Sequence, residues 1–260
     1  MMKLPFFVVV ACLAATAPSS ANAQRERDEV TAPREAAVSA SGARSIEIEA
    51  RAGSLRIQGR KGISEVRATG TARASDRDLL EQIKLTATRE GDVVHVVVET
   101  PDSHGWRGNR YAGLDLLVEV PEGLPLKVED SSGEIEIRGV AGVELHDSSG
   151  EIEMEKIGGS IRIEDSSGRI GVRDVQGDVH VRDGSGEIVV RGVRGSVVVE
   201  VDGSGSIDVS DVTGDVRVGS DGSGGIEVQD VGGDFTVGND GSGGISYRNI
   251  KGTVKIPRKK

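Results

Sequence analysis

A four-residue motif, Asp-Ser/Gly-Ser-Gly, recurs along the second half of the chain and constrains its fold more than any other feature. Successive copies begin 17, 18, 18, 19, 19 and 19 residues apart. A fixed period just under twenty predicts a repeat architecture, in which each copy is one structural unit that cannot bury its apolar face alone. We call these motifs tags, and their seven aspartates are Asp130, Asp147, Asp165, Asp183, Asp202, Asp221 and Asp240.

Each tag is followed by two short arms in which apolar and polar residues alternate. In the fourth copy the arms are 187–191 and 196–199, with a glycine-containing corner between them. Alternation rich in β-branched residues predicts strands rather than helices. Such short strands bury their apolar face when identical coils stack about 4.8 Å apart and pair their backbone edges. The repeat therefore predicts an all-β fold, a parallel β-solenoid of about 18–19 residues per coil.

The rest of the chain divides by composition. The first 23 residues contain a lysine, an apolar core and an Ala-Asn-Ala site, which is typical of a secretory signal cleaved near Ala23. A lipoprotein signal ending at Cys12 is the competing interpretation, and we disfavour it because only eleven residues would precede the cysteine. The predicted parts are a signal peptide (1–23), a flexible leader (24–43), an irregular β-rich part (44–129), regular solenoid repeats (130–256) and a basic tail (257–260).

The irregular part carries several local signals. Alternation at 45–50, 54–57 and 64–68 predicts early, irregular coils. A serine at position 75, acidic residues and clustered apolar residues up to Ile83 favour a short helix capped by Ser75. Two alternating segments flank Glu90-Gly91 and predict a hairpin, and 114–120 predicts a further strand. We expect this part to cap the regular stack.

The exported leader, the strand segment Leu114-Asp115-Leu116-Leu117-Val118-Glu119-Val120 and the Gly-x-Ile/Val-x-Val couplets together resemble a known family. It is the bacterial exported β-strand-repeat family whose members are named as candidate adhesins. The likeness covers about residues 44–256. It implies a right-handed β-solenoid, placed in the periplasm or secreted, with a structural or adhesin-like role. The family supplies no catalytic motif to transfer to this chain.

The tag aspartates are the sharpest candidate for a site. Stacked coils would place them in a row with one strand spacing between neighbours, where like charges repel unless cations, hydrogen bonds or raised pKa values relieve them. One interpretation is calcium binding between turns, as in β-rolls with an 18-residue coil. The other, which we favour, is an Asx-turn in which each aspartate accepts backbone N–H bonds from the residues that follow it.

A second candidate is the polar loop at residues 101–113, which contains one tryptophan and one tyrosine. Such residues dominate protein–protein hot spots, so the loop is a candidate contact for a partner. The other interpretation, which we favour, is a mobile hairpin loop without a binding role. The residues are His104, Trp106, Arg107, Arg110 and Tyr111. Aromatic residues make up only 2% of the chain, which weighs against an extended sugar-stacking surface. The formal net charge of −10 argues against nucleic acid as a partner.

These features predict a non-enzymatic, exported protein that acts as a structural or adhesin-like binding module of the cell envelope. Its partner would be an envelope protein or a glycan, and no later apolar run is long enough to span a membrane. A calcium-binding β-roll is one alternative. A polysaccharide-active β-helix enzyme is another, but it requires acids clustered in a cleft, whereas these acids repeat uniformly. No catalytic residue and no cofactor other than calcium is predicted.

Overall fold

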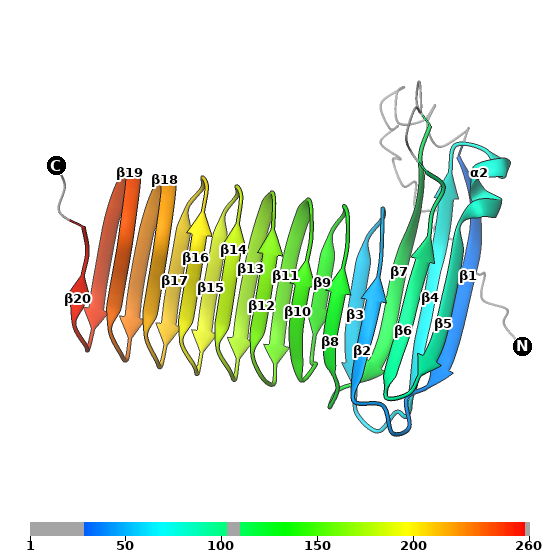
Figure 1. Ribbon diagram of the computed structural model, residues 1–260, viewed down its shortest axis with the longest axis horizontal. Coiled ribbons are helices and arrows are strands. Elements are labelled where there is room, and N and C mark those ends of the chain that lie inside the picture. Colours follow the sequence, from blue (N-terminus) through cyan, green and yellow to red (C-terminus); the bar gives the residue numbers. More distant parts are fainter. Residues whose placement is uncertain (1–28, 103–109, 258–260) are drawn as a thin grey trace, which may run out of the picture.

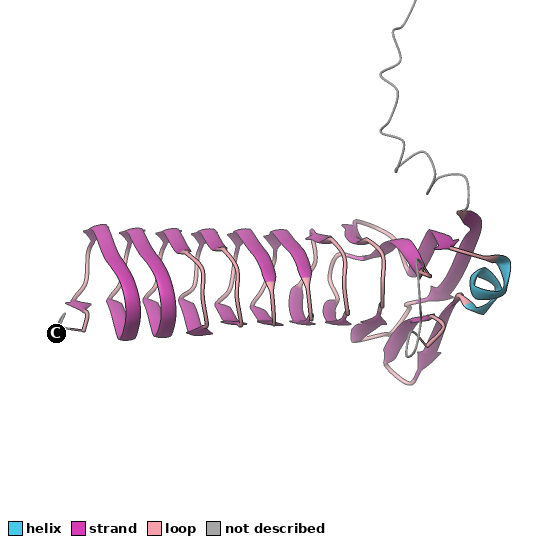
Figure 2. Ribbon diagram, turned by 90° about the horizontal axis from the view of Figure 1, so that it is seen from above, coloured by secondary structure: helices cyan, strands magenta, loops and turns pink. Residues whose placement is uncertain are grey.

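The computed structural model describes residues 29–102 and 110–257, which form an elongated stack of β-coils with a broader β-rich cap at its N-terminal end (Figure 1). The predicted signal peptide lies outside the described residues. Seen from above, each coil consists of two strand layers joined by turns (Figure 2). Because the strands of successive coils pair in parallel, the predicted β-solenoid is confirmed.

Two parallel sheets run the length of the stack. The first sheet contains the strands that follow the tags: β9 (Ile135–Arg138), β11 (Gly150–Ile157), β13 (Gly168–Val175), β15 (Ile188–Val193) and β17 (Ile207–Val212). The second contains the strands that lead into them: β8 (Pro125–Glu129), β10 (Gly142–His146), β12 (Ile161–Asp165), β14 (Val179–Asp183) and β16 (Val197–Asp202). The later strands β18 (Val216–Val231) and β19 (Phe235–Ile250) run through the tag and belong to both sheets, and β20 (Val254–Lys255) follows.

Strict register between coils builds the core. Ile170 pairs with Ile188, and Ile188 pairs with Ile207, so that one apolar side chain lies directly above the next. All three are at most 1% exposed. The intervening residues of each strand point outward, as the alternation predicts. The interior is therefore a continuous aliphatic column between the two sheets.

Most of the cap is an insertion between the first two coils. Strands β2 (Ser45–Glu49) and β3 (Leu55–Arg60) stack in parallel on β8 and β9, so they form a regular coil rather than an irregular one. Residues 61–124 lie between them in sequence and add β4 (Glu65–Ala74), β5 (Lys84–Glu90), β6 (Val93–Glu99) and β7 (Ala112–Pro121). The predicted hairpin is confirmed as antiparallel β5 and β6, and the predicted strand at 114–120 is β7.

The predicted short helix is confirmed as α2 (Arg77–Gln82), but its cap is not the predicted serine. Asp76 is the N-cap residue, and its carboxylate accepts the N–H of Leu79 at 2.9 Å. Aspartate accepts such a bond as well as serine does, so the sequence pattern alone does not decide between adjacent candidates.

The prediction of a flexible leader over 24–43 was wrong for its second half. Residues Val30–Ser39 form strand β1, which pairs antiparallel with β4 along ten residues. Its alternation is weak because Ala36 and Ala37 stand side by side. Pro33 is tolerated because β1 pairs with β4 on one side only, and an edge strand does not need every N–H.

The C-terminal end of the stack is open. Strand β20 pairs only with Phe235 and Thr236, so most of β19 has no coil above it. Consequently Tyr247 is 48% exposed, whereas Val228, its partner in the preceding coil, is buried. In the described part of the chain, no helix has the length and apolar character needed to cross a membrane.

Candidate functional site

The tag aspartates lie on the interior side of the solenoid. In β14, Val179, Val181 and Asp183 are all buried, while His180 and Arg182 between them are not. Consecutive tags are in register, because Asp165 pairs with Asp183 and Asp183 pairs with Asp202. From Asp130 to Asp221 the exposed fraction never exceeds 7%, and only the last member, Asp240, is less buried. We call these residues the aspartate column. Continuing the alternation of β14 through to the tag would have predicted this inward direction.

Each carboxylate of the column is only partly satisfied by hydrogen bonds. Oδ1 of Asp165 accepts the N–H groups of Ser166 (2.7 Å) and Ser167 (3.3 Å). The equivalent oxygens of Asp183 and Asp202 accept the N–H of the second residue after each of them, at 3.2 and 3.1 Å. The Asx-turn interpretation is thus confirmed for three tags. The Oδ2 atoms of the same three residues are buried without a partner. The oxygens of Asp130, Asp147 and Asp221 make no hydrogen bond of good geometry, although nearby turn N–H groups favour their ionised forms.

This environment raises the pKa of every carboxyl group from Asp130 to Asp221. Burial is the largest cause because it disfavours the charged form. The pKa of Asp130 rises to about 7, with a further contribution from the negative charge of Asp147. The pKa of Asp202 rises to about 6 through burial and the charges of its two neighbours in the column. The column is therefore an array of carboxyl groups that resist ionisation.

The cap contains an eighth tag without an aspartate. Ala50-Arg51-Ala52-Gly53 follows β2, and Glu49 pairs with Glu129, so Ala50 occupies the position equivalent to Asp130. The backbone of this turn is similar to that of the first aspartate tag, since Gly53 has φ +123° and its equivalent Gly133 has φ +131°. A search for aspartate misses this tag, although its register with the next coil identifies it. The turn therefore forms without a carboxylate.

The column does not offer calcium a complete coordination shell. Calcium takes six to eight oxygen ligands, whereas each pair of stacked carboxylates offers two to four free oxygens. Backbone carbonyls beside the column are already engaged between coils, as in the bond from Gly184 N–H to Asp165 O at 3.1 Å. Within residues 29–102 and 110–257, no group of three or more histidine, cysteine or acidic side chains is arranged to hold a metal. The predicted calcium site does not fit these donors.

The outer surface of the first sheet carries a network of ion pairs centred on Arg169. Its guanidinium contacts Glu151 at 3.0 Å, Glu153 at 2.6 Å and Glu187 at 2.9 Å. These carboxylates raise the pKa of Arg169. Glu153 also contacts Arg173 at 2.6 Å, reaching over Gly171, which presents no side chain on this surface. The network joins three consecutive coils on their solvent side.

Replacing Arg169 by methionine should lower the free energy of unfolding by about 1 kcal/mol, because exposed ion pairs contribute little individually and three glutamates would then repel one another. The loss should shrink in 1 M NaCl, where charges are screened within about 3 Å. Thermal melts at low and high salt check this. Arg217→Met is the matched control, since Arg217 is exposed and makes no ion pair with any described residue.

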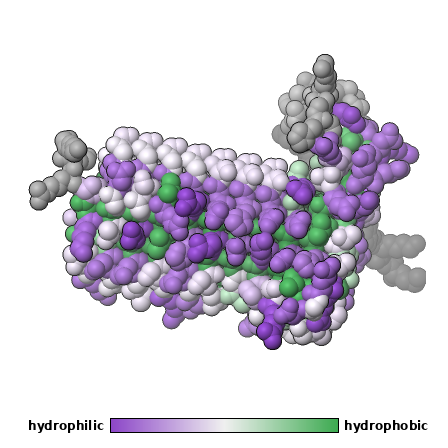
Figure 3. All heavy atoms as spheres, in the orientation of Figure 1, coloured by the Kyte–Doolittle hydropathy of each residue, from purple (hydrophilic) through white to green (hydrophobic). Residues whose placement is uncertain are grey.

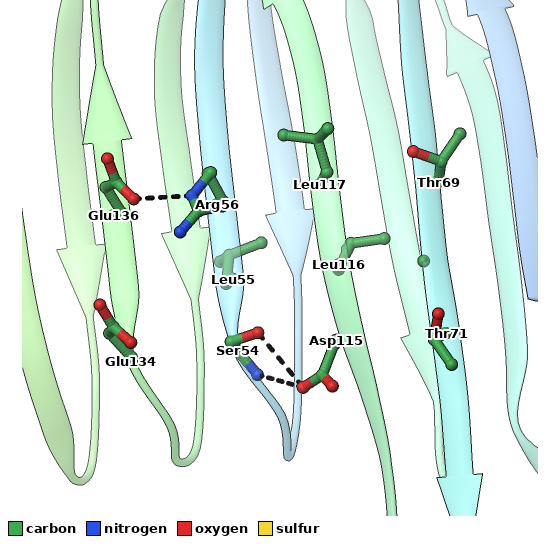
Figure 4. A pocket seen from close by; sticks show the side chains of 11 residues that line it. Ser54, Leu55, Arg56, Thr69, Thr71, Asp115, Leu116, Leu117, Glu134 and Glu136 are labelled. Carbon is green, nitrogen blue, oxygen red and sulfur yellow. Dashed lines mark hydrogen bonds and ion pairs between the residues drawn. The ribbon is translucent and has the colours of Figure 1, made fainter. Parts of the chain in front are cut away.

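A polar hollow of about 450 Å³ lies on the outer face of the first sheet where it joins the cap. Figure 4 shows side chains from β3, β4, β7 and β9 around it. Asp115 accepts the N–H of Ser54 at 3.0 Å and contacts Arg73 at 2.7 Å, and Arg56 contacts Glu136 at 2.6 Å. The lining includes Ser54, Arg56, Thr69, Thr71, Asp115, Leu117, Glu134 and Glu136. The sequence analysis missed this site because its four strands are far apart in the chain.

The predicted partner loop is described only in part. His104, Trp106 and Arg107 lie outside the described residues. Arg110 is 3.6 Å from Asp76 at the start of α2, and Tyr111 is 39% exposed. Both line a hollow of about 710 Å³ beside the end of β6. The structure therefore brings together two of the five predicted residues.

Histidines do not form a catalytic arrangement with the tags in the described part of the chain. His146 lies on the outer face between Glu144 (3.5 Å) and Glu164 (3.4 Å), and His180 points outward from β14. The aspartates point to the opposite side of the same strands. A nucleophile needs a base within hydrogen-bond reach, and the recorded side-chain contacts of His146 are with glutamates.

Comparison with known proteins gives structural likenesses only. No family model and no curated protein matches the chain. A candidate cell adhesion protein from Clostridium sporogenes is 12% identical, with 88% of this chain and 100% of that chain covered and a TM-score of 0.39. A candidate lipid-binding protein from Parabacteroides distasonis is 12% identical, with coverage of 87% and 97% and a TM-score of 0.42. A candidate adhesin from Bacteroides fragilis is 11% identical, with coverage of 90% and 99% and a TM-score of 0.31.

Proposed function

We propose that this protein is an exported, non-enzymatic β-solenoid that serves as a structural and adhesin-like binding module of the cell envelope, either periplasmic or secreted. The observation that carries the proposal is the polar hollow on the cap. It presents a partly exposed leucine, Leu117, surrounded by hydroxyl, carboxylate and guanidinium groups. Such a surface suits a sugar ring, whose apolar face would rest on Leu117 while its hydroxyls bond the rim.

The charge of the hollow restricts the class of ligand that fits it. Three carboxylates, Asp115, Glu134 and Glu136, line it, against one lining cation, Arg56. Glu136 and Arg56 neutralise each other, and Asp115 is bound by Arg73. Glu134 keeps its negative charge available. A neutral or amino-bearing glycan therefore fits the hollow better than an anionic one.

The state of Asp115 supports a binding role rather than catalysis. Burial opposes its ionisation, but hydrogen bonds from Ser54 and Arg73 outweigh burial and lower its pKa. A general acid for glycoside cleavage needs the opposite shift. The carboxylate is held as a fixed acceptor, which suits recognition of hydroxyl groups.

Calorimetry with four hexameric oligosaccharides tests the proposal: cellohexaose, chitohexaose, the chitosan hexamer and an oligogalacturonate. We expect binding of a neutral or amino-bearing member, and at least about tenfold weaker binding when Thr69→Val and Thr71→Val are combined, since each lost hydrogen bond to a ligand is worth about 1 kcal/mol. Thr86→Val with Thr88→Val is the matched control, because this exposed pair lies on β5 and outside the hollow.

Three outcomes would contradict the proposal. Preferential binding of the oligogalacturonate would show that the charge argument is wrong. Equal weakening by both threonine pairs would place the ligand elsewhere. Shorter oligosaccharides appearing during the incubation would show that the protein is an enzyme.

A further inference from the structure

The aspartate column has no part in the proposed binding function, and the fold does not require it. The eighth tag makes its turn with Ala50 in place of the aspartate. Yet seven successive coils retain the carboxyl group, six of them at most 7% exposed. Keeping a polar group in an apolar interior is costly unless it bonds to something. The question is what the free oxygens bind.

The unpartnered oxygens point to a ligand inside the column. Asp221 is fully buried, and neither of its oxygens makes a hydrogen bond of good geometry, although the nearby N–H of Ser223 partly offsets the effect of burial on its pKa. Asp202, directly below it, uses Oδ1 for the turn and leaves Oδ2 buried and free. Asp183 repeats the arrangement one coil earlier. The three residues are in register on the interior side of the stack, and their backbones are one strand spacing apart, about 4.8 Å.

The surrounding charges do not compensate an ionised column. The charges that act on it are its own neighbouring aspartates and, at its first member, Arg51 of the cap. The other charged groups on the same strands face outward: His146 on β10, Glu164 on β12, Arg182 on β14 and Glu200 on β16. The first-sheet strands that face the column contribute aliphatic side chains such as Ile170, Ile188 and Ile207. Six ionised carboxylates would therefore repel one another. Arg51 would offset this repulsion only at Asp130, the first member of the column.

We propose that the aspartate column is a buried proton-binding site, in which the carboxyl groups from Asp130 to Asp221 are protonated in mildly acidic solution and hydrogen-bond to one another along the stack. A protonated carboxyl group supplies the O–H donor that the interior otherwise lacks, and the free oxygen of the next aspartate accepts it. The solenoid takes up these protons when it folds and releases them when it unfolds. The protein is therefore more stable in mildly acidic than in mildly alkaline solution.

The pH range follows from the direction of the shifts. An unfolded aspartate has a pKa of about 3.9. In the folded column the pKa is about 6 for Asp165 and Asp202 and about 7 for Asp130. The folded state binds more protons between these values, so its extra stability is complete below about pH 4 and is lost as the pH rises through about 6 to 7. This direction is the reverse of that for ordinary salt-bridged carboxylates.

Thermal melts of the protein and of Asp202→Asn, at pH 5 and at pH 8 in EDTA, test the proposal. Asparagine keeps the shape and the acceptor oxygen and cannot ionise. We expect Asp202→Asn to raise the melting temperature by about 4 °C at pH 8 and by about half as much at pH 5, where the aspartate of the unfolded chain is already ionised. The comparison within each pH isolates the effect of residue 202, because the two proteins share every other group.

The matched control is Asp215→Asn. Asp215 lies at an exposed corner of the same stack, and its Oδ1 accepts the N–H of Asp234 at 2.8 Å. Its replacement should not raise the melting temperature at pH 8. A lower melting temperature for Asp202→Asn at pH 8, or an equal effect at both pH values, would overturn the proposal, because either result would mean that the column works as charged acceptors.

Two further measurements keep the proposal testable if Asp202→Asn fails to fold. In the unaltered protein, carbon-13 NMR of the aspartate carboxyl groups should show several resonances that titrate between about pH 5 and pH 7. Titration of all of them below about pH 4.5 would contradict the proposal. Millimolar calcium should leave the melting temperature at pH 8 unchanged, and a rise of many degrees would show that a cation, rather than protons, occupies the column.

Discussion

Replacing Gly224 by alanine is expected to unfold the solenoid, whereas the same replacement at Gly225 is expected to leave it folded. Gly224 has φ +149°, and a Cβ atom there would overlap the carbonyl oxygen of Gly205 in the coil beneath. Gly225 has no such φ, and a Cβ atom would meet nothing within 4 Å. Forbidden backbone geometry and a backbone clash together should cost about 3–5 kcal/mol at Gly224.

The effect is large because the coils cannot move apart to relieve it. Backbone N–H groups and carbonyls of adjacent tags hold the coils together, as in the bond from Gly205 N–H to Ser223 O at 2.9 Å. Circular dichroism melts of the two variants check the prediction. If Gly224→Ala melts within a degree or two of Gly225→Ala, the close approach of the tags does not hold in solution.

The repeat alone predicts most of the regular stack. The arms, the alternation and the register between coils all follow from period and apolar pattern, as His180 pointing outward between buried Val179 and Val181 illustrates. Local rules also suffice for the hairpin of β5 and β6, whose turn residues are adjacent in sequence. These features depend on interactions within one coil or between identical coils, and the sequence contains both.

What the sequence does not predict depends on contacts between distant, dissimilar segments. Strand β1 forms because β4 offers it a free edge, and nothing in the sequence of β1 itself identifies β4 as its pairing partner. The hollow arises where β3, β4, β7 and β9 come together, with Arg56 and Glu136 separated by 80 positions in the chain.

The direction of the tag aspartates shows how a small irregularity conceals a site. In β14 the alternation runs unbroken from Val179 to Asp183 and points the aspartate inward. In the 19-residue coils one extra residue precedes the aspartate, and the register shifts between Val181 and Arg182 where β14 meets β16. This bulge keeps Asp202 buried although simple alternation would turn it outward. The tags themselves form the pale serine- and glycine-rich ridge along the upper edge of the stack (Figure 3).

Introducing an aspartate into β15 tests whether the interior tolerates a carboxylate away from the tag turns. Val190 is fully buried in β15, between Val172 and Val209 of the neighbouring coils. Val189, the preceding residue, points outward and lines a charged hollow with Arg173 and Arg191. We expect Val190→Asp to lower the free energy of unfolding by at least about 4 kcal/mol at pH 8, since its carboxylate would be buried without a partner. Val189→Asp should change it by less than about 1 kcal/mol.

Chemical denaturation of both variants at pH 8 and pH 5 measures the difference. Val190→Asp should recover part of its stability at pH 5, because a protonated carboxyl group is less costly to bury. It should remain below the native protein even there, because strand N–H groups beside position 190 are already bonded between coils, whereas the tag turn offers the N–H of Ser204 to Asp202. If Val190→Asp proves as stable as Val189→Asp at pH 8, the interior tolerates unpaired charge, and the reason for placing protons in the aspartate column disappears.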